Sequence, residues 1–156
     1  MTTDDIIILI TGLVGTIGFS ILFGVKVKNL FFAALGGLIA GFVAVVLKET
    51  GTFISSTVAA FAATLYCEIT ARIKKAPVVT FLTPSIVVLV PGSALYYTVS
   101  NLILKDYTKM LEYGLSTIDA CLGIAAGILV ASLVVTIYFH LRNRISKHRQ
   151  SHIERM

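Results

Sequence analysis

The segment Leu30 to Leu47 decides the fold class, because it reads LFFAALGGLIAGFVAVVL and carries no charged side chain. A membrane-spanning helix needs roughly 17–25 predominantly apolar residues. This segment reaches that length, and apolar segments of similar length lie on both sides of it. Together they predict membrane spans at residues 6–25, 30–47, 53–73, 78–104 and 115–141. We therefore expect an all-α, polytopic membrane protein with about five transmembrane helices.

The composition of the whole chain agrees with this prediction. Of its 156 residues, 56% are hydrophobic and 13% are charged, whereas soluble domains average about 45–50% and 25%. A core of this size cannot hide so many aliphatic side chains from water. Residues 1–141 are expected to form one five-span membrane domain, and residues 142–156 a basic cytoplasmic tail.

The distribution of Lys and Arg predicts the orientation. With the N-terminus outside, the outer side would carry only Lys48, Lys105 and Lys109. The other ten would face the cytoplasm: Lys26, Lys28, Arg72, Lys74, Lys75, Arg142, Arg144, Lys147, Arg149 and Arg155. Because cytoplasmic loops are enriched in Lys and Arg, we expect a plasma-membrane protein with its N-terminus outside and its C-terminus inside. The tail would contact anionic lipid rather than nucleic acid.

The sequence lacks the motifs typical of enzymes and metal sites. It contains no Gly-x-Ser-x-Gly elbow, no His-Glu metal motif and no Gly-Lys-Ser/Thr phosphate loop. The three histidines, His140, His148 and His152, lie at the end of the last span or in the tail. We expect neither an enzyme nor a protein that binds a metal or a cofactor.

The fourth predicted span is unusual because Pro84 and Pro91-Gly92 lie inside it. Proline has no N–H, so these two residues leave the carbonyls of Thr80 and Val87 without their helical partners. Broken backbone at membrane depth is tolerated only where it is buried in protein or lines a cavity. Secondary transporters bind substrates at such interruptions near the bilayer midplane, and Pro91 is the midpoint of this span. The interruption is therefore either a solute site or a structural kink.

Polar side chains follow the interruption. Ser93, Tyr97 and Asn101 are spaced i, i+4, i+8, with Tyr96 and Ser100 on the adjoining strip, so they predict one hydroxyl- and amide-bearing face. The candidate residues of a solute path are Pro84, Ser85, Pro91, Gly92, Ser93, Tyr96, Tyr97 and Asn101.

Three charged residues lie near the ends of spans. Glu68 and Arg72 have the i, i+4 spacing of an ion pair at the interface, and coupling or gating is the alternative. Asp119 is either an acid in the first turn of the last span or a carrier of a proton or cation.

Two GxxxG pairs, Gly37 with Gly41 and Gly123 with Gly127, predict close contacts between helices. Such contacts serve either ordinary bundle packing or a moving interface.

The third and fourth spans carry a series of short motifs whose order and spacing resemble those of a known family. The motifs are Glu68-Ile-Thr-Ala-Arg72, Ala76-Pro77, Phe81-Leu-Thr-Pro84, Leu89-Val-Pro-Gly92 and Leu95-Tyr-Tyr-Thr98. The family is that of threonine/serine exporters (ThrE-like), and the resemblance is to its small, membrane-only half. It covers most of the chain up to about Leu141.

The resemblance implies gradient-driven export of threonine, serine or similar small polar metabolites. Because fused members join this module to a larger one of about five spans, it also implies a larger membrane subunit as partner. Export of dicarboxylates such as succinate, also linked to this small type, is one alternative. An accessory subunit that does not touch solute and a small homo-oligomeric channel are the others.

Overall fold

The computed structural model describes residues 3–153, with side-chain surroundings for residues 5–141, and these residues form helices joined by short turns. The elements are α1 (Thr3–Leu22), α2 (Val27–Val46), η1 (Lys48–Thr50), α3 (Thr52–Lys74), α4 (Val79–Ile86), η2 (Val87–Leu89), α5 (Gly92–Ile103) and α6 (Tyr107–Ile153). Four helices are long and apolar enough to cross a membrane, and a fifth span results if the bent α4–η2 and α5 pair is counted as one. The predicted all-α, multi-span fold is confirmed.

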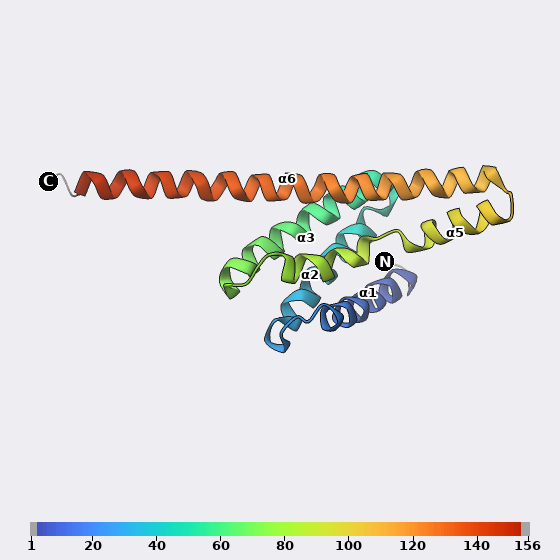
Figure 1. The fold of residues 1–156 in the computed structure, drawn as a ribbon, viewed down its shortest axis with the longest axis horizontal. Helices are drawn as coiled ribbons and strands as arrows, with labels where there is room; N and C mark the ends of the chain where they lie inside the picture. Colours follow the sequence, from blue (N-terminus) through green and yellow to red (C-terminus); the bar gives the residue numbers. More distant parts are fainter. Residues whose placement is uncertain (1–2, 154–156) are drawn as a thin grey trace.

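The helices form two regions of different packing (Figure 1). In the first, α2 packs against α1, α3 and α4, and α3 packs against α6. The name bundle is used below for α1, α2, α3, α4 and η2, together with the part of α6 that lies beside α3. In the second, α5 lies along the beginning of α6, and α6 is its main packing partner. We call α5 and the beginning of α6 the hairpin.

The two ends of the bundle differ in charge. The α1–α2 and α3–α4 turns lie at one end, which we call the lysine end because Lys26, Lys28, Lys74 and Lys75 line one cavity there. At the opposite end, the Lys48 ammonium is 2.9 Å from the Asp5 carboxylate and links η1 to α1. We call this the η1 end.

Small residues bring the helices of the bundle into close contact, and the prediction from the two GxxxG pairs is confirmed. A Cβ atom on Gly37 would lie 2.1 Å from Thr16 Oγ1 of α1. One on Gly127 would lie 2.3 Å from the Thr57 carbonyl oxygen of α3. Because only glycine fits at these distances, the helix contacts depend directly on the missing side chains.

The last predicted span and the predicted tail are parts of one helix. We expected a span at 115–141 and a separate tail at 142–156, but α6 runs without a break from Tyr107 to Ile153. The side chains of the predicted basic tail lie outside the described residues.

Candidate functional site

The interruption of the fourth predicted span has a direct backbone cause. Val90 is extended (φ −63°, ψ 124°) because the ring of Pro91 disfavours a helical conformation in the preceding residue. The segments before and after the break meet at 51°. Pro91 has no N–H to donate to Val87 O. This oxygen instead accepts a hydrogen bond from Val90 N–H at 3.2 Å. The break therefore satisfies one of the two carbonyls that the prolines were expected to free.

Pro84 and Ser85 lie inside the bundle, and both are fully buried. Ser85 Oγ donates to Phe81 O at 2.7 Å and lies 3.2 Å from Ala33 O of α2. Cys67 Sγ of α3 is 3.7 Å from the same hydroxyl. Ser85 thus joins α2, α3 and α4, and in this conformation its hydrogen bonds are made to protein.

Within the bundle, Ser85 is level with the middle of α2, and Pro91 lies nearer the η1 end. The Ser85 hydroxyl packs against Gly36, the central part of α2. Leu89 belongs to a buried cluster with Ala40, and Ala44 packs against that cluster, so Leu89 is level with the last two turns of α2. Pro91 follows two residues later and therefore lies toward the η1 end. The position of Pro91 near the bilayer midplane stays a prediction.

The remaining path candidates lie on the hairpin. None of the residues of α5 is buried, and the Tyr96 side chain is 68% exposed. Asn101 Nδ2 donates to Tyr97 O at 2.8 Å, and the Tyr97 ring packs on Tyr113 of α6 at 5.2 Å between centroids. The structure therefore divides the eight candidates. Pro84 and Ser85 are inside the bundle, and Pro91, Gly92, Ser93, Tyr96, Tyr97 and Asn101 are at the break or on the exposed hairpin.

Glu68 and Arg72 form the ion pair that their spacing predicts, between Glu68 Oε2 and Arg72 Nη1. Arg72 Nη1 also donates to Glu68 O at 2.8 Å. The guanidinium lies 4.2 Å from the centre of the Phe139 ring of α6. Glu68 is mostly shielded and Arg72 is partly exposed, so the pair sits where α3 and α6 meet.

Asp119 is not in the first turn of its helix, because α6 begins at Tyr107 instead of near residue 115. Asp119 is exposed and lies one turn before Gly123, which contacts Phe53 at the start of α3. Asp119 is therefore level with the η1 end of the bundle, where the hairpin begins to extend away from it.

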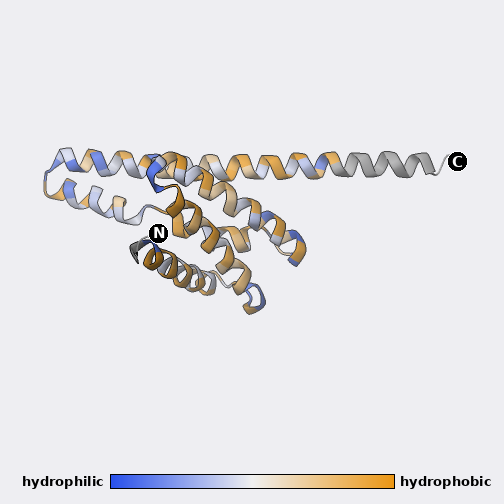
Figure 2. Cartoon of the chain, turned by 180° about the vertical axis from the view of Figure 1, so that it is seen from behind, coloured by the Kyte–Doolittle hydropathy of each residue, from blue (hydrophilic) through white to orange (hydrophobic). Residues whose placement is uncertain are grey.

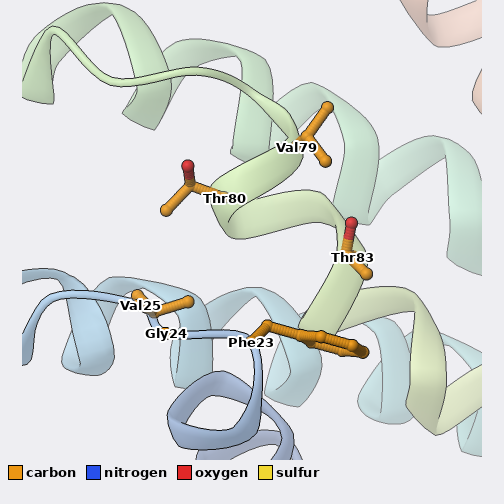
Figure 3. A pocket seen from close by; sticks show the side chains of 6 residues that line it. All are labelled: Phe23, Gly24, Val25, Val79, Thr80 and Thr83. Atoms are coloured by element: carbon orange, nitrogen blue, oxygen red, sulfur yellow. The ribbon is translucent and has the colours of Figure 1, made fainter.

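A cavity at the lysine end was not predicted. Figure 3 shows its inner part, where Thr80 and Thr83 of α4 lie across from Phe23, Gly24 and Val25. This part has a volume of about 380 Å³. The spacing of Thr80 and Thr83, i and i+3 just before Pro84, was the available signal. Because Pro84 cannot bond to Thr80 O, the loosened turn of α4 borders the cavity.

Among the described residues, no three His, Cys, Asp or Glu side chains are grouped as a metal site requires.

Comparison with known proteins places the chain in a family. No curated protein and no solved structure matches it. The sequence pattern of the family described as "Threonine/Serine exporter, ThrE" matches residues 8–134, which include α2 to α5 and most of α1. The chain therefore belongs to the threonine/serine exporter family, a family of membrane transporters.

Proposed function

We propose that this chain is the small subunit of a split, gradient-driven exporter of threonine, serine or similar small polar metabolites, and that it works with a larger membrane subunit of the same family. The observation that carries the proposal is the exposed polar face of α5, directly after the break at Pro91. Hydroxyl and amide groups beside interrupted backbone are typical of solute sites in secondary transporters. Within the described residues, α6 is the main packing partner of α5, and Tyr96 and Ser93 on this face are exposed.

The need for a partner follows from the cost of exposing such groups to lipid. Ser93 and Asn101 carry groups that need hydrogen bonds, and a carboxylate such as Asp119 near hydrocarbon costs about 2.5–3.5 kcal/mol in the centre of a span. A second subunit packed against α5 would shield these groups and form the opposite wall of a solute path. The path would then run between the two subunits.

The lysine end predicts how the protein is oriented in the membrane. Lys26, Lys28, Lys74 and Lys75 lie together at that end, so the positive-inside rule puts it in the cytoplasm of a plasma-membrane protein. This orientation leaves the N-terminus outside, and places the hairpin toward the outer side.

Two acidic residues are candidates for coupling export to an ion gradient. Glu68 is paired with Arg72, so separating the two would break a charged contact at the junction of α3 and α6. Asp119 lies level with the start of the polar hairpin. We assign Asp119 to coupling and the Glu68–Arg72 pair to gating, because Arg72 bridges α3 and α6.

The test is export of labelled threonine from preloaded cells that express this chain alone, the candidate large subunit alone, or both. We expect export only when both are present. Export of succinate in place of threonine would indicate a dicarboxylate exporter. If neither solute is exported, the accessory role remains as the explanation. Export by this chain alone would contradict the split exporter and favour a homo-oligomer.

A variant then tests the break itself. Pro91→Ala combined with Gly92→Ala restores a helix-compatible backbone, and we expect it to lose export while the protein remains in the membrane. The matched control is Gly15→Ala combined with Gly18→Ala, since a Cβ at either position meets nothing within 4 Å. Equal export by both variants would reduce the break to a structural kink.

A further inference from the structure

The cavity at the lysine end has a second, outer part with a volume of about 410 Å³. It lies between the α1–α2 turn and the α3–α4 turn, and it shares Gly24 and Thr80 with the inner part. Its volume falls in the range of small-molecule sites, roughly 300–1,000 Å³. Two segments that are about fifty residues apart in the sequence therefore form one concave surface.

The charge of this cavity has one sign. Four lysines line it, two near each turn: Lys26, Lys28, Lys74 and Lys75. None of the described residues that line it is acidic. Glu68, an acid nearly two turns before the end of α3, is paired with Arg72. The Lys74 ammonium rests on the Phe32 ring at 3.8 Å, a contact that leaves its positive charge uncompensated.

The backbone at this cavity is held by hydrogen bonds within its own turns, so the lysine side chains carry the attraction for an anion. The ends of α1 and α3 are capped by their own turns: Val25 N–H donates to Ser20 O at 2.9 Å, and Ala76 N–H donates to Ala71 O at 3.0 Å. Gly24 (φ 68°) and Lys75 (φ 50°) take the left-handed conformation that these caps need. In contrast, α2 and α4 begin here without any side-chain cap. Instead, three of their first N–H groups donate to backbone oxygens: Asn29 N–H to Lys26 O at 2.7 Å, Thr80 N–H to Pro77 O at 3.1 Å and Phe81 N–H to Val78 O at 3.0 Å.

We propose that this cavity binds an anionic carboxylate or phosphate group at the lysine end of the bundle. The four lysines would supply the attraction, and Asn29 and Thr80 would supply hydrogen bonds. The rest of the ligand would extend toward Thr83 and the apolar side chains of the inner part. The same chemistry belongs to a free metabolite anion and to the headgroup of an anionic lipid. The experiment separates these two sources.

Binding is measured on the purified full-length chain in nanodiscs. In discs of phosphatidylcholine alone, calorimetric titration with succinate and with inorganic phosphate tests a free anion. In discs that also contain phosphatidylglycerol, native mass spectrometry counts the anionic lipid that stays on the protein. Because the readout is binding, the result does not depend on whether the chain exports threonine.

The test variant removes one lysine from each turn, as Lys26→Gln combined with Lys75→Gln. Since a basic residue near a membrane surface contributes about 1 kcal/mol to anion binding, we expect the dissociation constant to rise about tenfold or more. The matched control, Lys105→Gln combined with Lys109→Gln, removes the same charge from the α5–α6 turn and should bind like the wild type. Lys26→Arg combined with Lys75→Arg keeps the charge and should keep the binding.

Each outcome decides for or against the site. Succinate or phosphate binding that is weakened only in the Lys26/Lys75 glutamine variant establishes a site for a free anion. Phosphatidylglycerol that is lost only from that variant establishes a lipid headgroup site. The proposal fails if neither anion nor lipid distinguishes that variant from its control. It also fails if the arginine variant, folded by circular dichroism, loses as much binding as the glutamine variant.

Discussion

The bundle and the hairpin differ both in how apolar they are and in how they pack. Helices of the bundle meet through glycine, alanine and serine, and seven residues of α2 are buried by their neighbours. In α5 no residue is buried, and its aromatic and aliphatic side chains are exposed. Figure 2 shows the same contrast, since the helices of the bundle are strongly hydrophobic whereas α5 and the first turns of α6 are paler.

The contrast shows that hydrophobicity alone does not decide which helices of a membrane protein pack together. Lipid already solvates apolar side chains, so helices associate where small residues let their backbones approach. The bundle has such residues facing each other, and it completes itself within one chain. The hairpin, in which α5 packs mainly on α6, keeps side chains such as Tyr96 exposed.

The largest expected effect comes from a methyl group at a close contact between α6 and the backbone of α3. In Gly127→Ala the new Cβ would lie 2.3 Å from Thr57 O and 2.9 Å from Ala60 Cβ. A backbone oxygen cannot rotate away, so we expect about 1–3 kcal/mol of destabilisation. Gly15→Ala is the control, because nothing lies within 4 Å of its Cβ. Thermal unfolding in detergent measures both, and equal midpoints would mean that α3 and α6 do not meet here.

A smaller loss is expected from the buried hydroxyl at the centre of the bundle. Ser85→Ala removes the hydrogen bond to Phe81 O, worth about 1 kcal/mol. The equivalent change in the hairpin, Ser93→Ala, alters an exposed side chain and should leave the unfolding midpoint unchanged. If Ser93→Ala were the more damaging of the two, the division between a packed bundle and an open hairpin would be reversed.

Substitutions in the hairpin should reduce export more than they reduce the stability of the fold. Tyr96 is 68% exposed, so Tyr96→Ala is expected to change the free energy of unfolding by less than about 0.5 kcal/mol. Because Tyr96 lies on the proposed solute face, threonine export with the large subunit should fall severalfold. Leu111→Ala, at an exposed apolar position of α6, is the control and should retain export. A loss of export in both variants would remove any special role of the polar face.

The smallest expected effect is a pH dependence at the turn of the hairpin. The pKa of the Asp106 carboxyl lies below its usual value, because Lys109 N–H donates to Asp106 Oδ1 at 3.2 Å and the Lys109 ammonium is 3.3 Å from Oδ2. Since the folded pKa is lower than the unfolded one, about 3.9, this contribution is complete above that value. It is lost as the pH falls through the folded pKa.

The Asp106 carboxyl carbon resonance in an NMR titration measures this pKa directly. Lys109→Met removes the ammonium and keeps the backbone donor, so the pKa should rise part of the way toward its usual value. A folded pKa at or above the usual value would contradict the cap at the start of α6.

The sequence alone predicts the membrane fold, the proline break and the Glu68–Arg72 pair well, because each depends on local pattern or short spacing. It does not predict where α6 begins. Lys109 and Glu112 make residues 107–112 too polar for a span, but Asp106 caps a helix there all the same. Helix ends and span ends therefore differ, and Asp119 was misplaced for this reason.

Depth and tertiary neighbours were the other parts that could not be predicted. The level of Pro91 depends on the contacts of Ser85 and Leu89 with α2, which no pattern in residues 78–104 reveals. Lys26 and Lys75 were interpreted only as determinants of topology. Their shared cavity arises because α1–α2 and α3–α4 turn at the same end of the bundle.

The central claim is that the exposed face of α5 is completed by a larger subunit, and cysteine labelling at Tyr96 tests it most directly. Tyr96→Cys would be made with Cys121→Ser, which removes the exposed thiol, while the buried Cys67 stays. Cells expressing this chain with or without the large subunit would be treated with a polar maleimide. We predict labelling of residue 96 in the chain alone and protection when the large subunit is present. Equal labelling in both would contradict a partner on this face.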